Sequence, residues 1–379
     1  MNSSMSAFLA PEHSPPAQAA AEHVAYPASP MPDLGILTPF LQDERVHDIL
    51  VNGTKPIYVD IDGQLHDTGK AFASDAEVMV VAERIMEAIG QRWDPSRPLI
   101  DTRLADGSRV NIVAPPMAVD GVSISIRKFP ARIITLDSMV AAQQITPEIG
   151  EFMKQCAVRR LNIIVAGGTS SGKTTLLNAL SAAISPRERI VTIEDSAELR
   201  LQQPHVVRLE SKPPESLDKL HTAVTIRDLV KNALRMRPDR IVVGESRGAE
   251  AFDMLQAMNT GHDGSMTTLH ANTPREALGR LETMISVAMP QLTTRIVRQQ
   301  IASTIHMAVQ MSRTKDGMRR ITHVSEVAGM EGEMIVMQDL LTYQELPNKP
   351  AEYRWVAGAP RNSLVAEAAR AAGFVRTLR

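Results

Sequence analysis

The spacing of hydrophobic residues changes along the chain, and the change separates two kinds of structure. In the first part, apolar and polar positions alternate in short runs typical of half-buried strands joined by hairpins, at residues 57–61, 99–114 and 122–126. One stretch has the helical period, with Ser74 placed to cap a helix that continues to about Ile89. With a short helix at 34–41, the pattern predicts a small α+β domain over residues 34–130.

From residue 147 the pattern changes to compact apolar runs separated by amphipathic segments. Such runs are typical of strands buried on both faces of a parallel sheet, and they occur at 163–166, 189–193, 206–209, 241–243 and 266–269. Threonines cap the predicted helices, at Thr146, Thr225 and Thr273. The alternation predicts an α/β core over residues 147–346, and we expect the strands at 306–311 and 321–327 to form its edge.

Three other segments lack these periods. Residues 1–33 are rich in Ala, Pro and Ser and predict a disordered arm, which either docks to a partner or has no role. Residues 131–146 are expected to be a linker. Residues 347–379 are expected to be a polar tail with a short helix from Ser363.

Composition narrows the class of protein. Of the 379 residues, 44% are hydrophobic, which is enough for a sizeable core, and the formal net charge of -2 argues against a strongly basic nucleic-acid binder. Cys156 is the only cysteine, so the chain cannot form an internal disulfide, and a reducing cytosol is expected. We find no apolar run as long as the roughly 18 residues of a membrane span, and no secretory signal.

One motif points directly to chemistry. Residues 161–177 read LNIIVAGGTSSGKTTLL, a strand, a glycine-rich turn and a helix in the order G-x-x-x-x-G-K-T. Glycines bring backbone N–H groups against phosphate oxygens, the lysine reaches the β- and γ-phosphates, and Thr174 offers a hydroxyl to Mg²⁺. The alternative is a chance match in a polar loop. The motif predicts a nucleoside triphosphate site made by Gly167, Gly168, Thr169, Ser170, Ser171, Gly172, Lys173, Thr174 and Thr175.

Carboxylates follow two of the predicted strands, where a parallel sheet borders its ligand. Glu194 and Glu198 lie just past the strand at 189–193, and one of them could orient or deprotonate water; a solvated loop is the alternative. Glu245 ends the strand at 241–243 and is expected on the Mg²⁺ side, because Gly244 stands at the usual aspartate position. Arg247 is expected to reach either a phosphate or a neighbouring carboxylate.

Two further pairs are weaker candidates. His262 and His270 flank the strand at 266–269, where a histidine could sense the γ-phosphate or could simply be buried. Arg109 and Arg127 end strands of the small domain and could bring positive charge onto the nucleotide, although spacing alone favours surface arginines.

Taken together, these motifs resemble the Walker A, Asp box, Walker B and His box of the type II/type IV secretion ATPase superfamily. They are GGTSSGKTT at 167–175, IEDSAEL at 193–199, RMRPDRIVVGE at 235–245, and GHDGS and TLHAN between 261 and 272. The phrases are close to those of the CpaF/TadA-type branch, which powers Tad (Flp) pilus assembly, and the resemblance covers roughly residues 34–343.

The resemblance implies a RecA-like P-loop motor domain preceded by a smaller α+β domain, assembled as a ring hexamer with nucleotide between the two domains. It makes Glu198 the better general-base candidate and Glu194 the second one. It also assigns Glu245 to Walker B, His262 and His270 to the His box, and Arg109 and Arg127 to charge that closes onto the phosphates.

The expected activity is therefore Mg²⁺-dependent hydrolysis of ATP by a cytoplasmic motor, peripheral to the bacterial inner membrane. Its expected partners are its own copies and the membrane platform proteins of a pilus or secretion machine, without direct nucleic-acid contact. Two alternatives stay open: an ATP-driven nucleic-acid translocase, and a nucleotide-gated scaffold with little turnover.

Overall fold

The computed structural model describes residues 31–61, 63–129, 134–212, 223–345, 351–356 and 358–374. The chain forms two compact units, which divide between Pro130 and Ala131. The disordered arm expected at residues 1–33 lies outside the described residues except for its last three positions.

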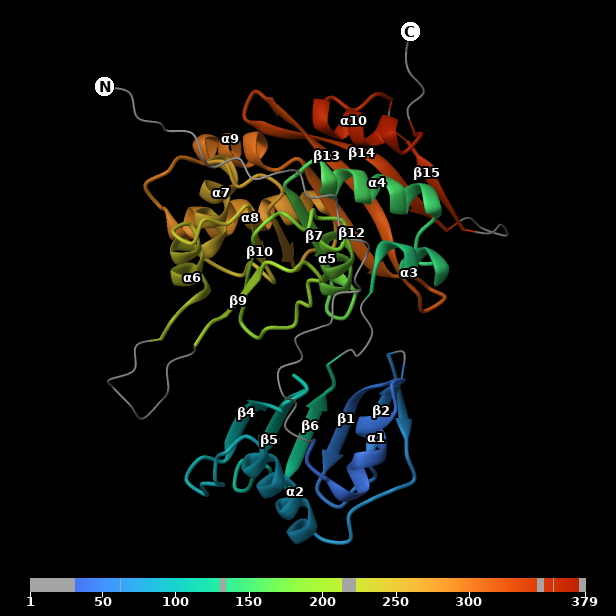
Figure 1. Cartoon of the computed structure of the whole chain (residues 1–379), viewed down its shortest axis with the longest axis vertical. Helices are drawn as coiled ribbons and strands as arrows, with labels where there is room; N and C mark the ends of the chain where they lie inside the picture. The colour runs from blue at the N-terminus through green and yellow to red at the C-terminus, as the bar shows by residue number, and fades with distance from the viewer. Residues whose placement is uncertain are drawn as a thin grey trace, which may run out of the picture. The chain divides into compact units, whose positions relative to one another are not determined.

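The first unit is an antiparallel sheet with a helix on one face (Figure 1). It opens with a 3-10 helix (Gly35–Leu37) and α1 (Thr38–Gln42). Within its described residues the strands run in the order β3-β2-β1-β6-β5-β4. Their bounds are β1 (Val46–Asn52), β2 (Tyr58–Ile61), β3 (Gln64–Asp67), β4 (Leu99–Arg103), β5 (Arg109–Val113) and β6 (Ser123–Arg127). The central strand β1 was not predicted, because His47 and Asp48 interrupt its apolar alternation.

Helix α2 (Asp75–Ala88) supplies the covering layer of this unit. Ser74 caps it by accepting a hydrogen bond from the Glu77 N–H, which confirms the predicted start. Val78, Val81 and Ile85 recur at helical spacing and are buried against the inward side chains of the strands. The opposite face of the sheet carries the polar positions of the same strands.

The second unit is built on a nine-stranded sheet, counted over the described residues, in the order β15-β14-β13-β12-β7-β11-β10-β8-β9. The strands from β12 to β9 in this order are parallel, and β13, β14 and β15 are added antiparallel. Their bounds are β7 (Ile163–Gly167), β8 (Ile190–Glu194), β9 (Val206–Glu210), β10 (Arg240–Val243), β11 (Met266–Leu269), β12 (Met307–Arg313), β13 (Arg319–Glu331), β14 (Met334–Gln344) and β15 (Glu352–Trp355).

Helices cover both faces of this sheet (Figure 1). Successive residues of β7 show why: Ile163 and Val165 join one buried cluster, and Ile164 and Ala166 join the other. One layer contains α3 (Leu136–Ala141), α4 (Pro147–Val158), α5 (Lys173–Ser181) and α10 (Ser363–Ala371). The other contains α6 (Ile226–Ala233), α7 (Glu250–Asn259), α8 (Pro274–Ala288) and α9 (Thr294–Thr304).

The structure corrects two expectations about this unit. The strands expected at the sheet edge lie inside it, because β12 pairs with β7 on one side and β13 on the other, while β14 continues the sheet beyond β13. The segment expected as a linker contains α3, whose Leu136 and Met139 are buried in the core.

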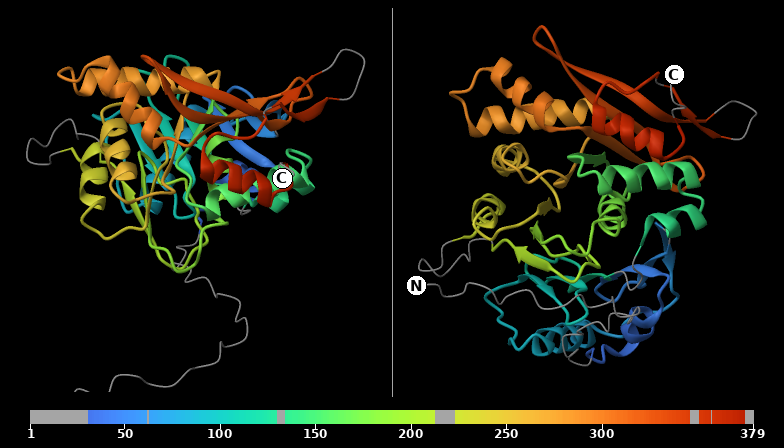
Figure 2. Two further views of the ribbon diagram at one scale, coloured as in Figure 1. Left: turned by 90° about the horizontal axis from the view of Figure 1, so that it is seen from above. Right: turned by 45° about the horizontal axis from the view of Figure 1, so that its top comes forward.

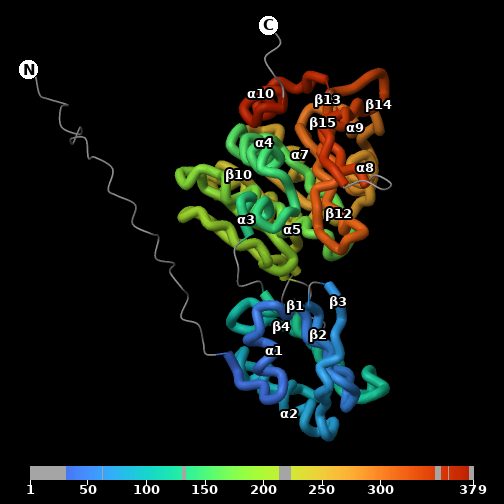
Figure 3. Tube along the Cα trace, turned by 90° about the vertical axis from the view of Figure 1, so that its right-hand side faces the viewer, coloured from blue at the N-terminus to red at the C-terminus, as the bar shows by residue number. Residues whose placement is uncertain are grey.

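The polar tail expected at 347–379 is also wrong where it is described, because residues 351–356 and 358–374 belong to the packed unit. The predicted helix from Ser363 is present as α10, and Figures 2 and 3 show it beside α4. Fully buried Glu326 accepts hydrogen bonds from the backbone N–H groups of Arg361 and Asn362, just before this helix. Buried apolar residues on one side of α10 give the segment a core contact that a polar tail would lack.

Candidate nucleotide-binding site

The loop between β7 and α5 has a shape that requires glycine at two positions. Gly172 precedes α5 with φ at 98°, in the left-handed region. A Cβ on Gly167 would lie 2.4 Å from Ser171 Oγ and 2.5 Å from the Met311 carbonyl oxygen. The loop therefore turns back on itself tightly, with Gly168, Thr169 and Ser170 exposed at its crest.

Lys173 lies at the start of α5, beneath this crest. Its ammonium donates hydrogen bonds to the carbonyl oxygens of Gly167 (3.1 Å) and Gly168 (2.7 Å). Burial lowers the pKa of Lys173, and nearby Arg247 lowers it further, whereas Glu245 opposes the shift. The N–H groups of the first turn of α5 have no carbonyl partner inside the helix, so the loop and helix start gather donors and a cation around one point. Ser171 Oγ is buried there without a hydrogen-bond partner in the described residues. These features fit a bound triphosphate.

Three loops bring charged side chains to the same edge of the sheet as this loop. Strands β8, β10 and β11 are parallel to β7, so their carboxyl ends share its edge. Glu245 follows β10 and stands between two partners: its Oε1 is 3.1 Å from Nε2 of His270, and its Oε2 accepts a 2.6 Å hydrogen bond from Arg247. Arg247 also contacts Asp195 Oδ2 at 3.3 Å.

Glu245, His270, Arg247 and Asp195 form a charged network, and the charge of Lys173 beside the glycine-rich loop acts on it. Burial lowers the pKa of His270, and the positive charges of Lys173 and Arg247 lower it further, whereas Glu245 opposes them. A neutral His270 can donate its Nε2–H to Glu245 and leave the carboxylate charged. The Arg247 side chain forms ion pairs with the carboxylates of Asp195 and Glu245 in this structure.

Glu194 and Glu198 have different surroundings. Glu194 ends β8 and is only 4% exposed, and its Oε2 accepts hydrogen bonds from the N–H groups of Glu198 (2.8 Å) and Leu199 (2.9 Å). Burial raises the pKa of Glu194 to about 7. Glu198 is only partly buried, and it lies four residues after Glu194 in the loop that follows β8, at the same edge of the sheet.

The two histidines do not come together. His270 follows β11 and joins the network, whereas His262 precedes this strand and contacts the Ala257 carbonyl oxygen at 3.1 Å through Nδ1. A strand of four residues is roughly 13 Å long, so His262 lies toward the other edge of the sheet.

Arg109 and Arg127 belong to the first unit and are direct cross-strand partners there. Asp101 lies 3.6 Å from Arg109, and Asp48 lies 2.9 Å from Arg127. Both arginines line a hollow of about 460 Å³ on the polar face of their sheet. Sequence reasoning missed Arg103, which pairs with Arg109 on its other side and extends the row to three arginines. The hairpin predicted over residues 99–114 contained this signal, because its two strands set residue 103 opposite residue 109.

Comparison with known proteins decides the family. A model of the type II/IV secretion system protein family matches residues 31–342. The chain belongs to this family.

The relatives of this secretion-family member agree with that assignment. A Mycobacterium tuberculosis protein with the provisional name conjugal transfer protein is 37% identical over 308 residues, which cover 79% of this chain and 86% of the relative. The type IV secretion system protein PtlH of Bordetella pertussis is 39% identical over 276 residues, which cover 66% of this chain and 80% of PtlH.

A solved structure extends the likeness to the fold. The Legionella pneumophila ATPase DotB matches with a TM-score of 0.58 and 24% identity, over 88% of this chain and 85% of that chain. The fold class predicted from the sequence is confirmed: a RecA-like P-loop motor domain follows a smaller α+β domain. Among the described residues of this family member, no helix is long and apolar enough to cross a membrane, and no cluster of three or more potential metal ligands occurs.

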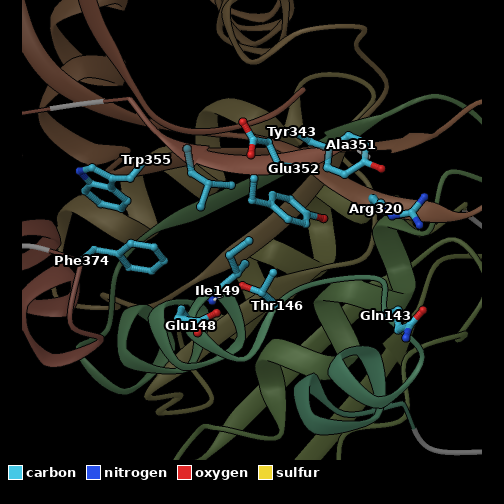
Figure 4. Close-up of a pocket in the computed structure, with 12 residues that line it drawn as sticks. Gln143, Thr146, Glu148, Ile149, Arg320, Tyr343, Ala351, Glu352, Trp355 and Phe374 are labelled. Carbon is cyan, nitrogen blue, oxygen red and sulfur yellow. Dashed lines mark hydrogen bonds between the residues drawn. The ribbon is translucent and has the colours of Figure 1, made fainter. Parts of the chain in front are cut away.

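Besides the hollow in the first unit, the chain has a hollow of about 530 Å³ in its second unit, beside the C-terminal strands. Figure 4 shows Tyr343, Trp355 and Phe374 around it, with Ile149 and Glu148 of α4 on the facing side. The phosphate loop is not among the described residues that line it. The C-terminal segment thus shapes a surface of its own, separate from the candidate nucleotide site.

Proposed function

We propose that this protein is a Mg²⁺-dependent ATPase that works as a hexameric motor for Tad/Flp-type pilus assembly or a related type II/IV secretion machine. One observation carries the proposal: the glycine-rich loop and Lys173 share a sheet edge with Glu245, Arg247 and His270. Cation, carboxylate and donor groups at that edge are the parts that phosphoryl transfer requires.

Each residue has a proposed role. The backbone N–H groups of residues 167–175 and the Lys173 ammonium would hold the phosphates, while the Thr174 hydroxyl and Glu245 would hold Mg²⁺, which neutralises phosphate charge when bound. Glu198 would accept a proton from the attacking water, since it is partly exposed in the loop after β8, at the sheet edge that also holds Lys173 and Glu245. The family resemblance supports a further contribution of positive charge from Arg109 and Arg127, and their adjacent positions are compatible with it.

The remaining parts of the proposal concern assembly and place. We infer a ring of six copies that is cytoplasmic, peripheral to the inner membrane, and attached there through platform proteins of the machine. The names of the relatives, type IV secretion and conjugal transfer, support a role in moving macromolecules across membranes. Because conjugal transfer appears among them, an ATP-driven nucleic-acid translocase remains the second candidate.

The test is the Mg²⁺-ATPase rate against protein concentration, with the mass of the assembly measured in parallel. We expect the rate per subunit to rise as a six-fold assembly forms and Lys173→Ala to abolish it. Lys154→Ala, which removes an exposed lysine of α4, serves as the matched control. An unchanged rate in Lys173→Ala would refute the proposal, and stimulation by single-stranded DNA would favour the translocase.

A further inference from the structure

We propose that Glu194 is a positioning residue for Glu198. Its buried carboxylate fixes the backbone that presents Glu198 at the phosphate edge, and it does not itself accept the proton of the attacking water. The inference rests on the proposed ATPase function, and it assigns different roles to two carboxylates that the sequence pattern could not separate.

The first observation is the pair of hydrogen bonds on one oxygen. The N–H groups of Glu198 and Leu199 both donate to Glu194 Oε2, at 2.8 and 2.9 Å. The backbone after β8 therefore closes over the Glu194 carboxylate. That oxygen accepts both bonds whether or not a proton sits on Oε1, so the contact survives titration of the group.

The neighbouring amides show that this backbone is held by side chains throughout. The Ala197 N–H donates to Glu210 Oε2 at 3.1 Å, and the Arg200 N–H donates to Asn178 Oδ1 at 2.9 Å. Residues 197–200 belong to no helix or strand, so these side chains take the place of a regular hydrogen-bond ladder. Glu194 holds the middle of this run, where Glu198 is attached.

The second observation is the space that the Glu194 side chain occupies. A Cβ on Gly244 would lie 2.7 Å from Glu194 Cγ, closer than side-chain atoms approach. Gly244 is itself fixed, because its N–H donates to the Ile193 carbonyl and its own carbonyl accepts from the Thr268 hydroxyl at 2.7 Å. Glycine at the usual aspartate position is therefore explained: the end of β10 leaves room for the carboxylate of β8.

The surroundings of Glu194 are poor for a base. The carboxylate is almost fully buried and one oxygen is engaged by two backbone donors. Its other oxygen, Oε1, is also buried and has no hydrogen-bond partner in the described residues. A general base needs contact with the proton that it removes, which Glu198, partly exposed, is better placed to make.

The direct test is amide hydrogen exchange at residues 195–200 in the full-length protein without nucleotide. Glu194→Ala should speed exchange at the Glu198 and Leu199 amides by about tenfold or more, and Glu194→Gln, which keeps an acceptor oxygen, should stay within roughly threefold of the parent. Gly244→Ala should speed exchange because its methyl group displaces Glu194. Gly279→Ala is the matched control, because a Cβ there meets nothing within 4 Å.

Kinetics separate positioning from chemistry. Glu194→Ala should lower kcat about a hundredfold with nucleotide affinity nearly unchanged, while Glu194→Gln should lower it less than about tenfold. Glu198→Gln, which keeps the shape but cannot accept a proton, should lose about a hundredfold or more.

Two results would overturn the inference. Exchange at residues 198 and 199 that is unaffected by Glu194→Ala would show that the carboxylate does not hold this backbone. A Glu194→Gln variant that exchanges slowly yet is as inactive as Glu194→Ala would show that Glu194 acts chemically. If the parent protein hydrolysed no ATP, the proposed function would fail, and the exchange comparison would still decide whether Glu194 holds the turn.

Discussion

Trp355 offers a sharp test of whether the C-terminal segment is part of the motor domain. It lies on β15, where its ring stacks on Phe374 with centroids 4.7 Å apart and meets Phe152 edge-on at 5.6 Å. Phe152 is fully buried in α4. Trp355→Ala removes one of two rings of the segment that contact Phe152, the other being Phe374.

The expected cost follows from these contacts. Replacing a fully buried Trp or Phe by Ala costs about 3–5 kcal/mol, and an aromatic pair adds about 0.5–1.5 kcal/mol beyond buried area. Because Trp355 is only partly buried, we expect a loss of about 2–3 kcal/mol. For a domain of this size that loss lowers Tm by roughly 5–10 °C.

Urea and thermal unfolding followed by circular dichroism measure this loss. Val356→Ala is the matched control, since the neighbouring Val356 side chain is 48% exposed. A Trp355→Ala variant as stable as the Val356→Ala variant would refute the packing argument, and residues 351–374 would then be a dispensable tail.

Three other predictions concern the buried ion pair of Glu188 with Arg240, the glycine-rich loop before α5, and Arg127 in the first unit. Glu188→Ala should destabilise the protein by about 3–5 kcal/mol in urea unfolding, because it strips the partner from the fully buried Arg240 guanidinium, which Glu188 binds at 2.7 and 2.9 Å. Burial alone would raise the pKa of Glu188, but the hydrogen bonds and charge of Arg240 outweigh it, so the folded-state pKa lies below 4.5. The stability contributed by the ion pair should therefore be complete above pH 4.5, the unfolded-state pKa, and should be lost as pH falls through the folded-state pKa. Gly167→Ala should abolish binding of a fluorescent ATP analogue, since its Cβ would strike backbone; near-normal affinity would contradict the proposed cradle. Arg127→Ala should change the unfolding midpoint little, because the Arg127 side chain is 61% exposed at its contact with Asp48, yet it should lower kcat at least tenfold; a normal kcat would remove Arg127 from the site.

The sequence predicted the glycine-rich turn between β7 and α5 and the caps of several helices, because these depend on neighbouring residues. Thr146, Thr225 and Thr273 each accept a hydrogen bond from a backbone N–H within three residues, so the pattern of the chain contains the whole interaction. Strands that are buried on both faces were also predictable, since each is a continuous apolar run. Strand β1 and the C-terminal segment were not, because their stability comes from partners far away in the chain.

What the sequence determined by itself is the fold class, the strand, glycine-rich loop and helix at residues 163–181, and the set of charged residues that follow the strands. Tertiary structure decided which of those residues meet. The strand order put Glu245 beside His270, and it left His262 at the far end of β11. The fold also gave Glu194 and Glu198 different exposure, burying the first and leaving the second partly exposed, although both stand in one short motif. The physical reason is that exposure, hydrogen-bond partners and pKa depend on which strands become neighbours, and strand pairing joins residues that spacing in the sequence does not relate.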